Sequence, residues 1–337
     1  MKERLYKLDN FKAILIFLVV VGHLLNVFKG CGSMPIRAIY VAIYLFHVPA
    51  FYFISGYLTS SDRLKNNKNF VTYVVLYVLM YLYVWGICKI LSIPCGFDLF
   101  YPRGGTWFFF CLALFRLLLP LIEDTKYILP ITLVGAVAIG WVEDAGMYMS
   151  IARFFSYLPF FVCGVKIRQA GSLLKIIDGI RSKKKYTFAL ILAMLSSSVF
   201  LEYLVCTSRK YDIVKCRASY ASTGLGNIEG SLIRIVYLIA AFSITFLILA
   251  YISNKNTKLT YIGRGTLGIF FFHPVFKMLA KKYVVVSNCL VGGIEAIILS
   301  AIITLVLGLP IFTKVLLKLT NWINSKLFEN AEIKGQK

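Results

Sequence analysis

Lys12 and His23 are the first pair whose types and spacing suggest chemistry, because they stand eleven positions apart around the apolar run 13–22. On a helix, at about 100° per residue, this spacing returns to within roughly 20° of the same face. At about 1.5 Å per residue the two lie roughly 16 Å apart, about half the hydrocarbon thickness of a bilayer. An ionisable group near the midplane is costly unless it faces a cavity or partner, so His23 is predicted to be functional. A neutral histidine in a helix–helix hydrogen bond is the alternative.

All three histidines of the chain lie inside apolar segments. His47 stands two residues before Pro49, and His273 directly precedes Pro274. A proline removes a backbone hydrogen bond from a helix and leaves polar groups open to whatever lines the space. Any one of these histidines could be a satisfied core residue, but three at depth indicate a shared site.

Acidic residues are scarce in the same segments: only Glu202 and Glu295 lie in apolar runs, each close to an end. Ion-coupled transporters usually keep a carboxylate at mid-depth, which argues against that class. A neutral imidazole can take a proton from an alcohol, and basic groups at the membrane surface can hold the phosphates of an activated donor. This combination fits acyl transfer from a thioester to a hydroxyl, with Ser55, the Gly56 amide or Trp107 stabilising the oxyanion.

The elements that position these residues are predicted to be membrane helices. Of the 337 residues, 59% are hydrophobic and 15% aromatic, and apolar runs of helical length recur from end to end. This composition indicates an all-α, polytopic integral membrane protein. We expect one membrane-embedded domain over residues 1–325 and a short polar cytoplasmic tail over residues 326–337. The first apolar run is interpreted as an uncleaved span, because no small-residue cleavage site follows it.

Ten spans are predicted from apolar length and helix breakers, at approximately residues 11–28, 36–58, 70–93, 104–121, 128–142, 151–167, 186–205, 232–252, 262–280 and 288–317. An even number puts both termini on one side. Most of the 37 Lys and Arg residues fall on that side, which the positive-inside rule assigns to the cytoplasm. We therefore expect a multi-pass protein of the plasma (inner) membrane. Membrane lipids account for the net charge of +22, and the absence of a zinc-finger or RNA-binding signature excludes nucleic acid.

The longest loop on the opposite side, about residues 206–230, is interpreted as an ordinary solvated connection; the alternative is an entrance for an acidic or sugar substrate. Its basic residues are Arg209, Lys210, Lys215 and Arg217. Cys206 and Cys216 share the loop and would pair only in an oxidising compartment, so free thiols are expected. The eight cysteines show no CxxC spacing, and no metal site is predicted.

Several motifs, in order along the chain, resemble the membrane-bound acyltransferase family 3, in particular its fucose 4-O-acetylase-like branch. An acidic and a basic residue precede Gly22–His23 in the first span, and Trp107–Phe108 opens the fourth. The second span carries His47, Pro49, Phe51, Phe53 and Ser55–Gly56–Tyr57. The sixth contains Leu158–Pro159–Phe160, and the ninth runs from Tyr261–Ile262–Gly263–Arg264 to His273–Pro274. These matches cover most of the chain.

The resemblance implies transfer of an acyl group, usually acetyl from acetyl-CoA, to a sugar hydroxyl of a cell-surface glycan or its lipid-linked precursor. It also implies that His23 is the central catalytic residue, a general base working with Lys12. Much of the family has Arg at that position, and Lys cannot form the planar two-pronged contact. Asp9 would help to position the donor, or would only cap the first helix. The expected donor-binding residues are Lys12, Ser55, Arg63, Lys65 and Arg264, and those expected on the acceptor side are His47, Trp107 and His273.

Further alternatives remain from the sequence, among them a regulatory or scaffold membrane protein in which the histidines would be dispensable. Ser55–Gly56 would serve only as a small-residue packing surface, and Trp107 only as an interfacial anchor. Arg63 and Lys65 would be anchors that follow the positive-inside rule. A membrane transporter of a glycan or lipid-linked sugar would use the same buried histidines for binding, without consuming a thioester.

Overall fold

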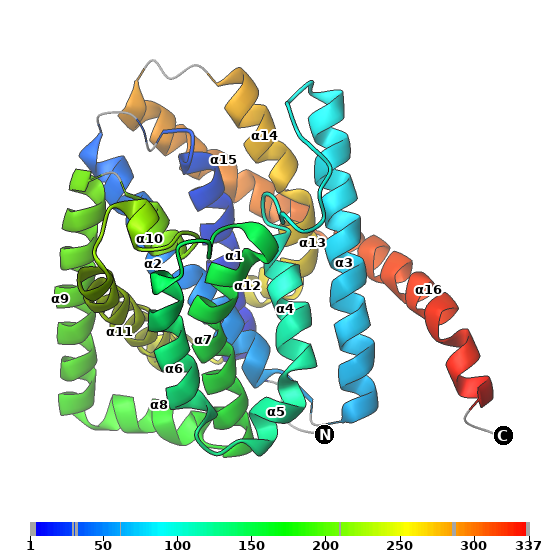
Figure 1. Cartoon of the computed structure of the whole chain (residues 1–337), viewed down its shortest axis with the longest axis horizontal. Helices are drawn as coiled ribbons and strands as arrows, with labels where there is room; N and C mark the ends of the chain where they lie inside the picture. Colours follow the sequence, from blue (N-terminus) through cyan, green and yellow to red (C-terminus); the bar gives the residue numbers. More distant parts are fainter. Residues whose placement is uncertain are drawn as a thin grey trace.

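The computed structural model describes residues 5–28, 30, 33–60, 62–208, 210–284 and 288–334, without the side chains of residues 63–66 and 328–334. Over this part of the chain every regular element is a helix. Several of the long helices run up and down the molecule side by side (Figure 1). This arrangement suits a chain in lipid, where each helix satisfies its own backbone polar groups. The predicted all-α class is confirmed for the described residues.

Within the described residues, seven helices are long and apolar enough to cross a membrane. They are α1 (Tyr6–Leu25), α2 (Met34–Tyr57), α3 (Arg63–Ile90), α7 (Ile151–Gln169), α9 (Lys184–Ser208), α11 (Asn227–Tyr251) and α15 (Cys289–Leu307). The other helices are α4 (Trp107–Leu117), α5 (Leu119–Asp124), α6 (Ile128–Ala138), α8 (Leu173–Ser182), α10 (Asp212–Lys215), α12 (Lys258–Arg264), α13 (Thr266–Phe272), α14 (Pro274–Tyr283) and α16 (Pro310–Lys334). Short 3-10 turns are η1 (Ile139–Trp141), η2 (Tyr148–Ser150) and η3 (Ala221–Thr223). The protein is a multi-pass membrane protein.

The remaining three of the ten predicted spans take other forms in the described residues. Those at 104–121 and 128–142 contain the shorter apolar helices α4 and α6. The ninth, at 262–280, is divided into α12, α13 and α14, with breaks at Gly265 and His273. Pro274 opens α14, where its missing N–H costs nothing. The tenth span also ends earlier than predicted, because α15 stops at Leu307 and Pro310 begins α16.

The first span begins earlier than hydropathy suggested. It was expected over residues 11–28 with His23 near the bilayer midplane, but α1 runs Tyr6–Leu25 and His23 lies in its last turn. Lys7 and Asn10 are buried, and their side chains donate hydrogen bonds to backbone carbonyls of the protein. The Lys7 ammonium donates to the Leu249 carbonyl, 2.6 Å away, and thereby satisfies an end carbonyl of α11. Hydropathy counts such residues as solvent-exposed, so it set the boundary too late.

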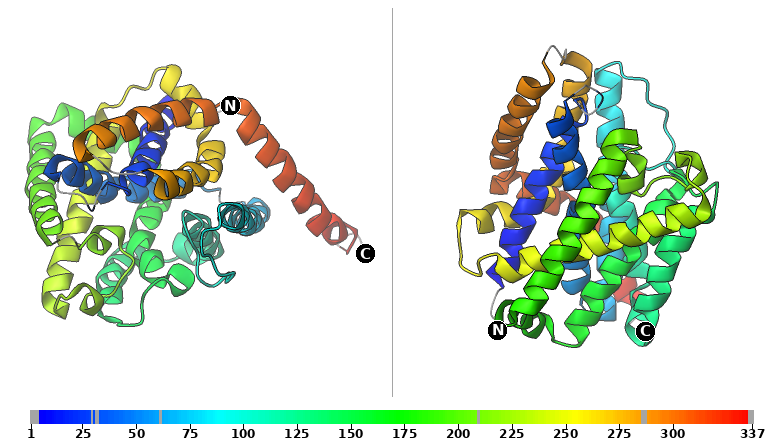
Figure 2. Two further views of the ribbon diagram at one scale, coloured as in Figure 1. Left: turned by 90° about the horizontal axis from the view of Figure 1, so that it is seen from above. Right: turned by 90° about the vertical axis from the view of Figure 1, so that its left-hand side faces the viewer.

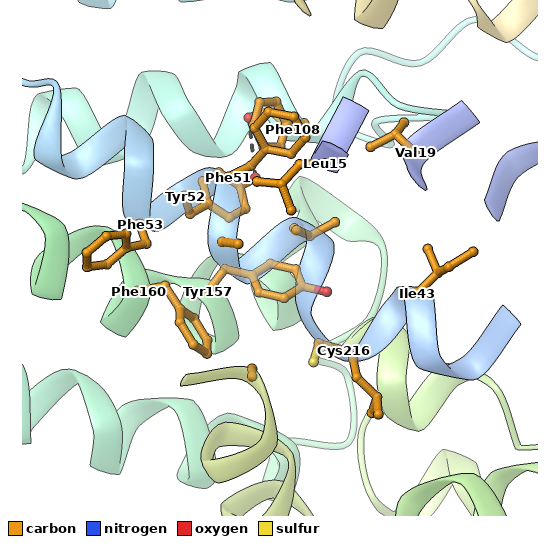
Figure 3. Packing of buried hydrophobic residues seen from close by; sticks show 14 of the residues in the cluster. Leu15, Val19, Ile43, Phe51, Tyr52, Phe53, Phe108, Tyr157, Phe160 and Cys216 are labelled. Carbon is orange, nitrogen blue, oxygen red and sulfur yellow. Dashed lines mark hydrogen bonds between the residues drawn. The ribbon is translucent and has the colours of Figure 1, made fainter. Parts of the chain in front are cut away.

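The core is built on the crossing of α2 and α7. A Cβ added to Gly56 would come within 2.1 Å of the Phe161 carbonyl oxygen, and one added to Gly164 within 2.1 Å of the Phe53 carbonyl oxygen. Only glycine therefore allows the two helices to approach so closely at this point. Around the crossing, Tyr52 on α2 packs against Phe108 and Tyr157 (Figure 3). The crossing fixes the helices that carry the aromatic walls of the site.

The two ends of the described chain lie toward the same end of the molecule. In Figure 1 the beginning of α1 and the far end of α16 are both at the bottom, together with α8. Figure 2 shows α16 extending away from the other helices. Residues 326–334, expected to be a polar tail, continue this helix. Cys206 and Cys216 are both free, as expected.

Candidate active site

A cavity of about 530 Å³ lies among α1, α2, α4, α7 and α14. It is walled by side chains of these helices, by the connection from α3 to α4 and by the residues at the end of α10. In Figure 1 α10 and the connection from α3 to α4 lie away from α8, toward the opposite end of the molecule. Among the predicted site residues, His23, His47 and Trp107 line this cavity.

His23 and His273 form a direct pair although they are distant in sequence. The Nδ1 atom of His23 lies 2.6 Å from Nε2 of His273, and the two ring planes are inclined by 28° with centroids 4.7 Å apart. His273 is buried behind His23 and is held in place at its own Nδ1, which is 2.8 Å from the Phe270 carbonyl oxygen and 3.1 Å from that of Ile269. The break between α13 and α14 therefore places a second imidazole behind the first.

The hydrogen-bond partners assign the tautomers of this pair. Carbonyl oxygens only accept hydrogen bonds, so Nδ1 of His273 carries the proton and, in the neutral ring, Nε2 is an acceptor. Nδ1 of His23 must then be the donor in the contact between the rings. Nε2 of His23 is left with a lone pair, and no described residue donates to it. A cavity-lining imidazole whose orientation is fixed by a second ring has the arrangement of a general base.

His47 is fixed in the same tautomer by its own helix. Its Nδ1 lies 2.5 Å from the Ile43 carbonyl oxygen, one turn earlier in α2. The ring meets Tyr44 edge to face, with centroids 4.9 Å apart. Pro49 lies within α2 two residues later. His47 therefore also presents an acceptor nitrogen, Nε2, to groups in the cavity.

Trp107 and Arg153 form a second pair in the cavity wall. The Arg153 guanidinium lies 4.5 Å from the centroid of the Trp107 ring, and the Trp107 ring stacks on Tyr157 at 5.8 Å. A guanidinium over an indole face is a favourable cation–π contact. Trp107 is thus a wall of the cavity rather than only an interfacial anchor.

Sequence reasoning missed Arg153 and assigned no site role to the other basic lining residues, which are Arg103, Lys215, Arg217 and Lys277. A tight turn before α7 joins this helix to the segment that carries Arg103. In this turn Met149 and Ser150 have positive φ values of 46° and 51°, and the Met149 N–H donates to the Phe100 carbonyl, 2.7 Å away. No hydropathy pattern could reveal that contact. Lys215 and Arg217 were noted in the sequence as part of the basic loop 206–230. That loop was interpreted as a solvated connection, and an entrance for an acidic or sugar substrate was the less favoured alternative.

The end of α10 is also held against α7. The Tyr157 hydroxyl donates to the Lys215 carbonyl at 3.2 Å. Arg234 on α11 donates to the Ser156 hydroxyl at 3.1 Å and contacts the Cys216 sulfur. These contacts fix the backbone from which two cations reach the cavity.

Asp9, Lys12 and Arg264 form a separate group and do not line the cavity. Lys12 Nζ lies 2.8 Å from Asp9 Oδ1, and Arg264 Nε lies 4.0 Å from Asp9 Oδ2. The capping alternative for Asp9 is wrong, because α1 begins at Tyr6 and Leu5 is its N-cap. A Cβ on Gly263 would lie 1.9 Å from the Asp9 carbonyl oxygen, so α12 packs directly on α1 here. The side chains of Arg63 and Lys65 lie outside the described part of the chain.

Ser55 is not among the residues that line the cavity. Its neighbour Gly56 is the point of contact between α2 and α7. The packing alternative for Ser55–Gly56 therefore accounts for what the structure shows. In the described residues no group of three His, Cys, Asp or Glu side chains is arranged to hold a metal ion.

Comparison with known proteins gives this site its context. A family model described as an acyltransferase domain, acyltransferase 3, matches residues 5–313. The chain belongs to this family. It is similar to the nodulation protein NolL of Mesorhizobium japonicum, with 29% identity over 210 residues that make up 57% of this chain and 55% of the relative. It is also similar to NolL of Sinorhizobium fredii, with 43% identity over 61 residues, 18% of this chain and 17% of that relative. The chain thus spans about half the length of the first relative and less of the second. No solved structure matches it significantly.

Proposed function

We propose that this protein is an integral-membrane O-acyltransferase that moves an acetyl group from acetyl-CoA to a sugar hydroxyl of a cell-surface glycan or its lipid-linked precursor. The observation that carries the proposal is the pairing of His23 with His273, which leaves Nε2 of His23 unprotonated in a cavity large enough for a sugar. Membership of the acyltransferase 3 family supports the same reaction class.

In the proposed reaction His23 is the general base. Its Nε2 takes the proton of the acceptor hydroxyl while that oxygen attacks the thioester carbonyl carbon. The tetrahedral intermediate then collapses, the carbon–sulfur bond breaks, and the departing sulfur receives the proton from His23. His273 stabilises the transient imidazolium through its acceptor Nε2, because its own proton is bonded to backbone carbonyls.

Trp107 is the proposed donor to the oxyanion. Of the three groups considered from the sequence, it alone lines the cavity, whereas Ser55 lies outside the lining and the Gly56 backbone is in the α2–α7 contact. A fixed N–H in a site from which water is excluded stabilises developing charge strongly. His47 is proposed to accept a hydrogen bond from another hydroxyl of the sugar and so to orient it.

The donor phosphates are proposed to bind at the group formed by Asp9, Lys12 and Arg264. Arg63 and Lys65, predicted from the sequence to share this role, remain part of the proposal. Lys12 lies roughly 16 Å along α1 from His23, so a long flexible arm on the donor would have to reach the base. We propose that this end faces the cytoplasm of the inner membrane. Cys289 at the start of α15 is disulfide-bonded, which fits an oxidising compartment for the other end.

The test is thioester turnover by the purified protein in nanodiscs. CoA release from acetyl-CoA would be followed with a panel of lipid-linked sugars. Wild type should release CoA in an acceptor-dependent way, and His23→Ala should lower kcat by about 10²- to 10⁴-fold. Lys12→Ala should raise the KM for acetyl-CoA, whereas Lys258→Ala, a matched change at an exposed lysine of α12, should not.

Two outcomes separate this proposal from its competitor. If wild type binds no acetyl-CoA and His23→Ala changes only the passage of glycan across vesicles, the protein is a transporter. If CoA is released equally by wild type and His23→Ala, the reaction does not use this base.

A further inference from the structure

The cavity carries charge of only one sign among the described residues. Its lining contains five basic side chains and no carboxylate; the five are Arg103, Arg153, Lys215, Arg217 and Lys277. They come from four different stretches of the chain, so they are not one solvated run of the sequence. A concave site lined by a single sign of charge with low-dielectric walls attracts and concentrates the opposite charge.

Arg153 is the buried member of this set. It is 8% exposed and lines the cavity from the first turn of α7. Its close contact in the described chain is the face of Trp107, and no described carboxylate lies within salt-bridge distance of it. A cation–π contact offsets only part of the cost of burying a guanidinium, and its five N–H donors are suited to oxygen acceptors. A buried arginine that forms no ion pair with any described acidic residue indicates an anion supplied by a ligand.

The neighbouring cations are less buried and are held near the same space. Arg217 Nε donates to Asp212 Oδ1 at 2.7 Å, and its side chain is 35% exposed. Lys215 Nζ lies 5.1 Å from the Tyr40 ring centroid and 5.3 Å from that of Tyr44. These two cations therefore line the same cavity as Arg153, from the end of α10.

We propose that the cavity recognises an acceptor with an anionic group beside the sugar, a phosphate or a carboxylate, and that Arg153 binds this group. The inference rests on the proposed acyl transfer, whose base lines the same cavity. Guanidinium pairs with either anion through two parallel hydrogen bonds, which would orient the sugar as well as hold it. Binding the anion at Arg153 leaves His23 to act on a hydroxyl of the attached sugar. The donor phosphates would bind instead to the separate cations Lys12 and Arg264, at the other end of α1.

The test is a binding titration that needs no turnover. Trp107 lies under the guanidinium, so its fluorescence reports on occupancy, and Trp107→Phe identifies its share of the signal. The probes are glucose 1-phosphate, glucuronic acid, glucose, inorganic phosphate and CoA, added to the full chain in nanodiscs. Wild type should bind one or both charged sugars more tightly than glucose, and the stronger of the two identifies the anion.

Substitutions assign the binding to Arg153. Arg153→Gln should lower the affinity for the charged sugar by about 10- to 100-fold, as expected for the loss of a hydrogen bond to a charged group. The affinity for glucose should be unchanged. Arg153→Lys should recover only part of the loss, because Lys lacks the two-pronged geometry. Arg181→Gln, which removes the same charge from an exposed site on α8, is the matched control and should bind as wild type. Because Arg153 is buried, substitution of the partly exposed Arg217 by Gln gives a second measurement, in which a smaller loss of affinity for the charged sugar is expected.

Three results would overturn the inference. Equal affinity for glucose and the charged sugars would exclude an anion-selective cavity. Inorganic phosphate binding as tightly as glucose 1-phosphate would mean that the sugar is not recognised. If Arg153→Gln lost CoA binding rather than sugar binding, the basic residues of the cavity would bind the acyl donor and not the acceptor. None of these depends on CoA release, so failure of the acyltransferase proposal is detected separately.

Discussion

His23 and His273 lie 250 positions apart in the sequence, yet their facing ring nitrogens are 2.6 Å apart. The pair joins the last turn of α1 to the break between α13 and α14. His273 is anchored by backbone carbonyls, so the orientation of His23 is set by the fold and not by solvent. The catalytic proposal depends on this relationship.

The first prediction concerns His273 as a positioning residue. His273→Phe keeps an aromatic ring beside His23 but removes the acceptor, so kcat should fall while the KM for acetyl-CoA stays near wild type. The loss should be smaller than the ~10²- to 10⁴-fold expected for His23→Ala, since the base itself remains. His273→Gln restores an oxygen acceptor and should recover part of kcat. Steady-state kinetics of the three variants checks this; equal kcat values for Phe and Gln would argue for a role in packing alone.

The second prediction concerns the Trp107 N–H. Trp107→Phe keeps an aromatic face for Arg153 and removes the proposed oxyanion donor, so kcat should fall by about 10²- to 10³-fold with little change in KM. Trp141→Phe is the matched control, because its indole donates to Ser231 outside the cavity at 2.8 Å. CoA release by both variants measures the difference. A comparable loss in the control would show that the effect is one of general stability.

The third prediction concerns Asn10, which joins α1 to the segment between α11 and α12. Its amide nitrogen donates to the Ser253 and Lys255 carbonyls at 2.9 and 3.0 Å, and its oxygen accepts from Thr260 at 2.7 Å. Asn10→Asp puts an oxygen against two carbonyls, and should lower the free energy of unfolding by about 1–3 kcal/mol. Asn227→Asp, at the exposed start of α11, should be neutral or slightly stabilising. Thermal unfolding in detergent compares the two; equal melting temperatures would contradict the role of Asn10.

The sequence predicted the helical class and brought His23, His47 and Trp107 to notice, because these depend on local composition and on motifs within single segments. The sequence predicted a shared site for His23 and His273, but not their direct contact, since that requires the fold to bring α1 beside the end of α13. Similarly, the boundary of α1 was placed too late because burial of Asn10 by distant partners is invisible to hydropathy.

The basic side of the cavity shows the same limit more sharply. Lys215 and Arg217 were seen as members of a basic loop, but loop composition alone does not distinguish a solvated connection from a wall. What decides between them is the hydrogen bond from Tyr157 to the Lys215 carbonyl, which lies outside any local pattern. Arg153 had no sequence signal beyond its position before an apolar run. Its role follows from the turn at Met149, which only the folded chain contains.

The last prediction concerns the contact of α2 with α7 at Gly56. Gly56→Ala would place a methyl group 2.1 Å from the Phe161 carbonyl oxygen, a backbone atom that cannot move without separating the helices. Overpacking of this kind typically costs about 1–3 kcal/mol. Gly86→Ala on α3 is the matched control, because nothing lies within 4 Å of the added carbon and alanine reduces the entropy of the unfolded chain. The melting temperature should therefore fall for Gly56→Ala and stay level or rise for Gly86→Ala. Since the crossing also carries Tyr52 against the aromatic wall, Gly56→Ala should lower CoA release as well. A stable, active Gly56→Ala protein would mean that the two helices cross less closely than described here.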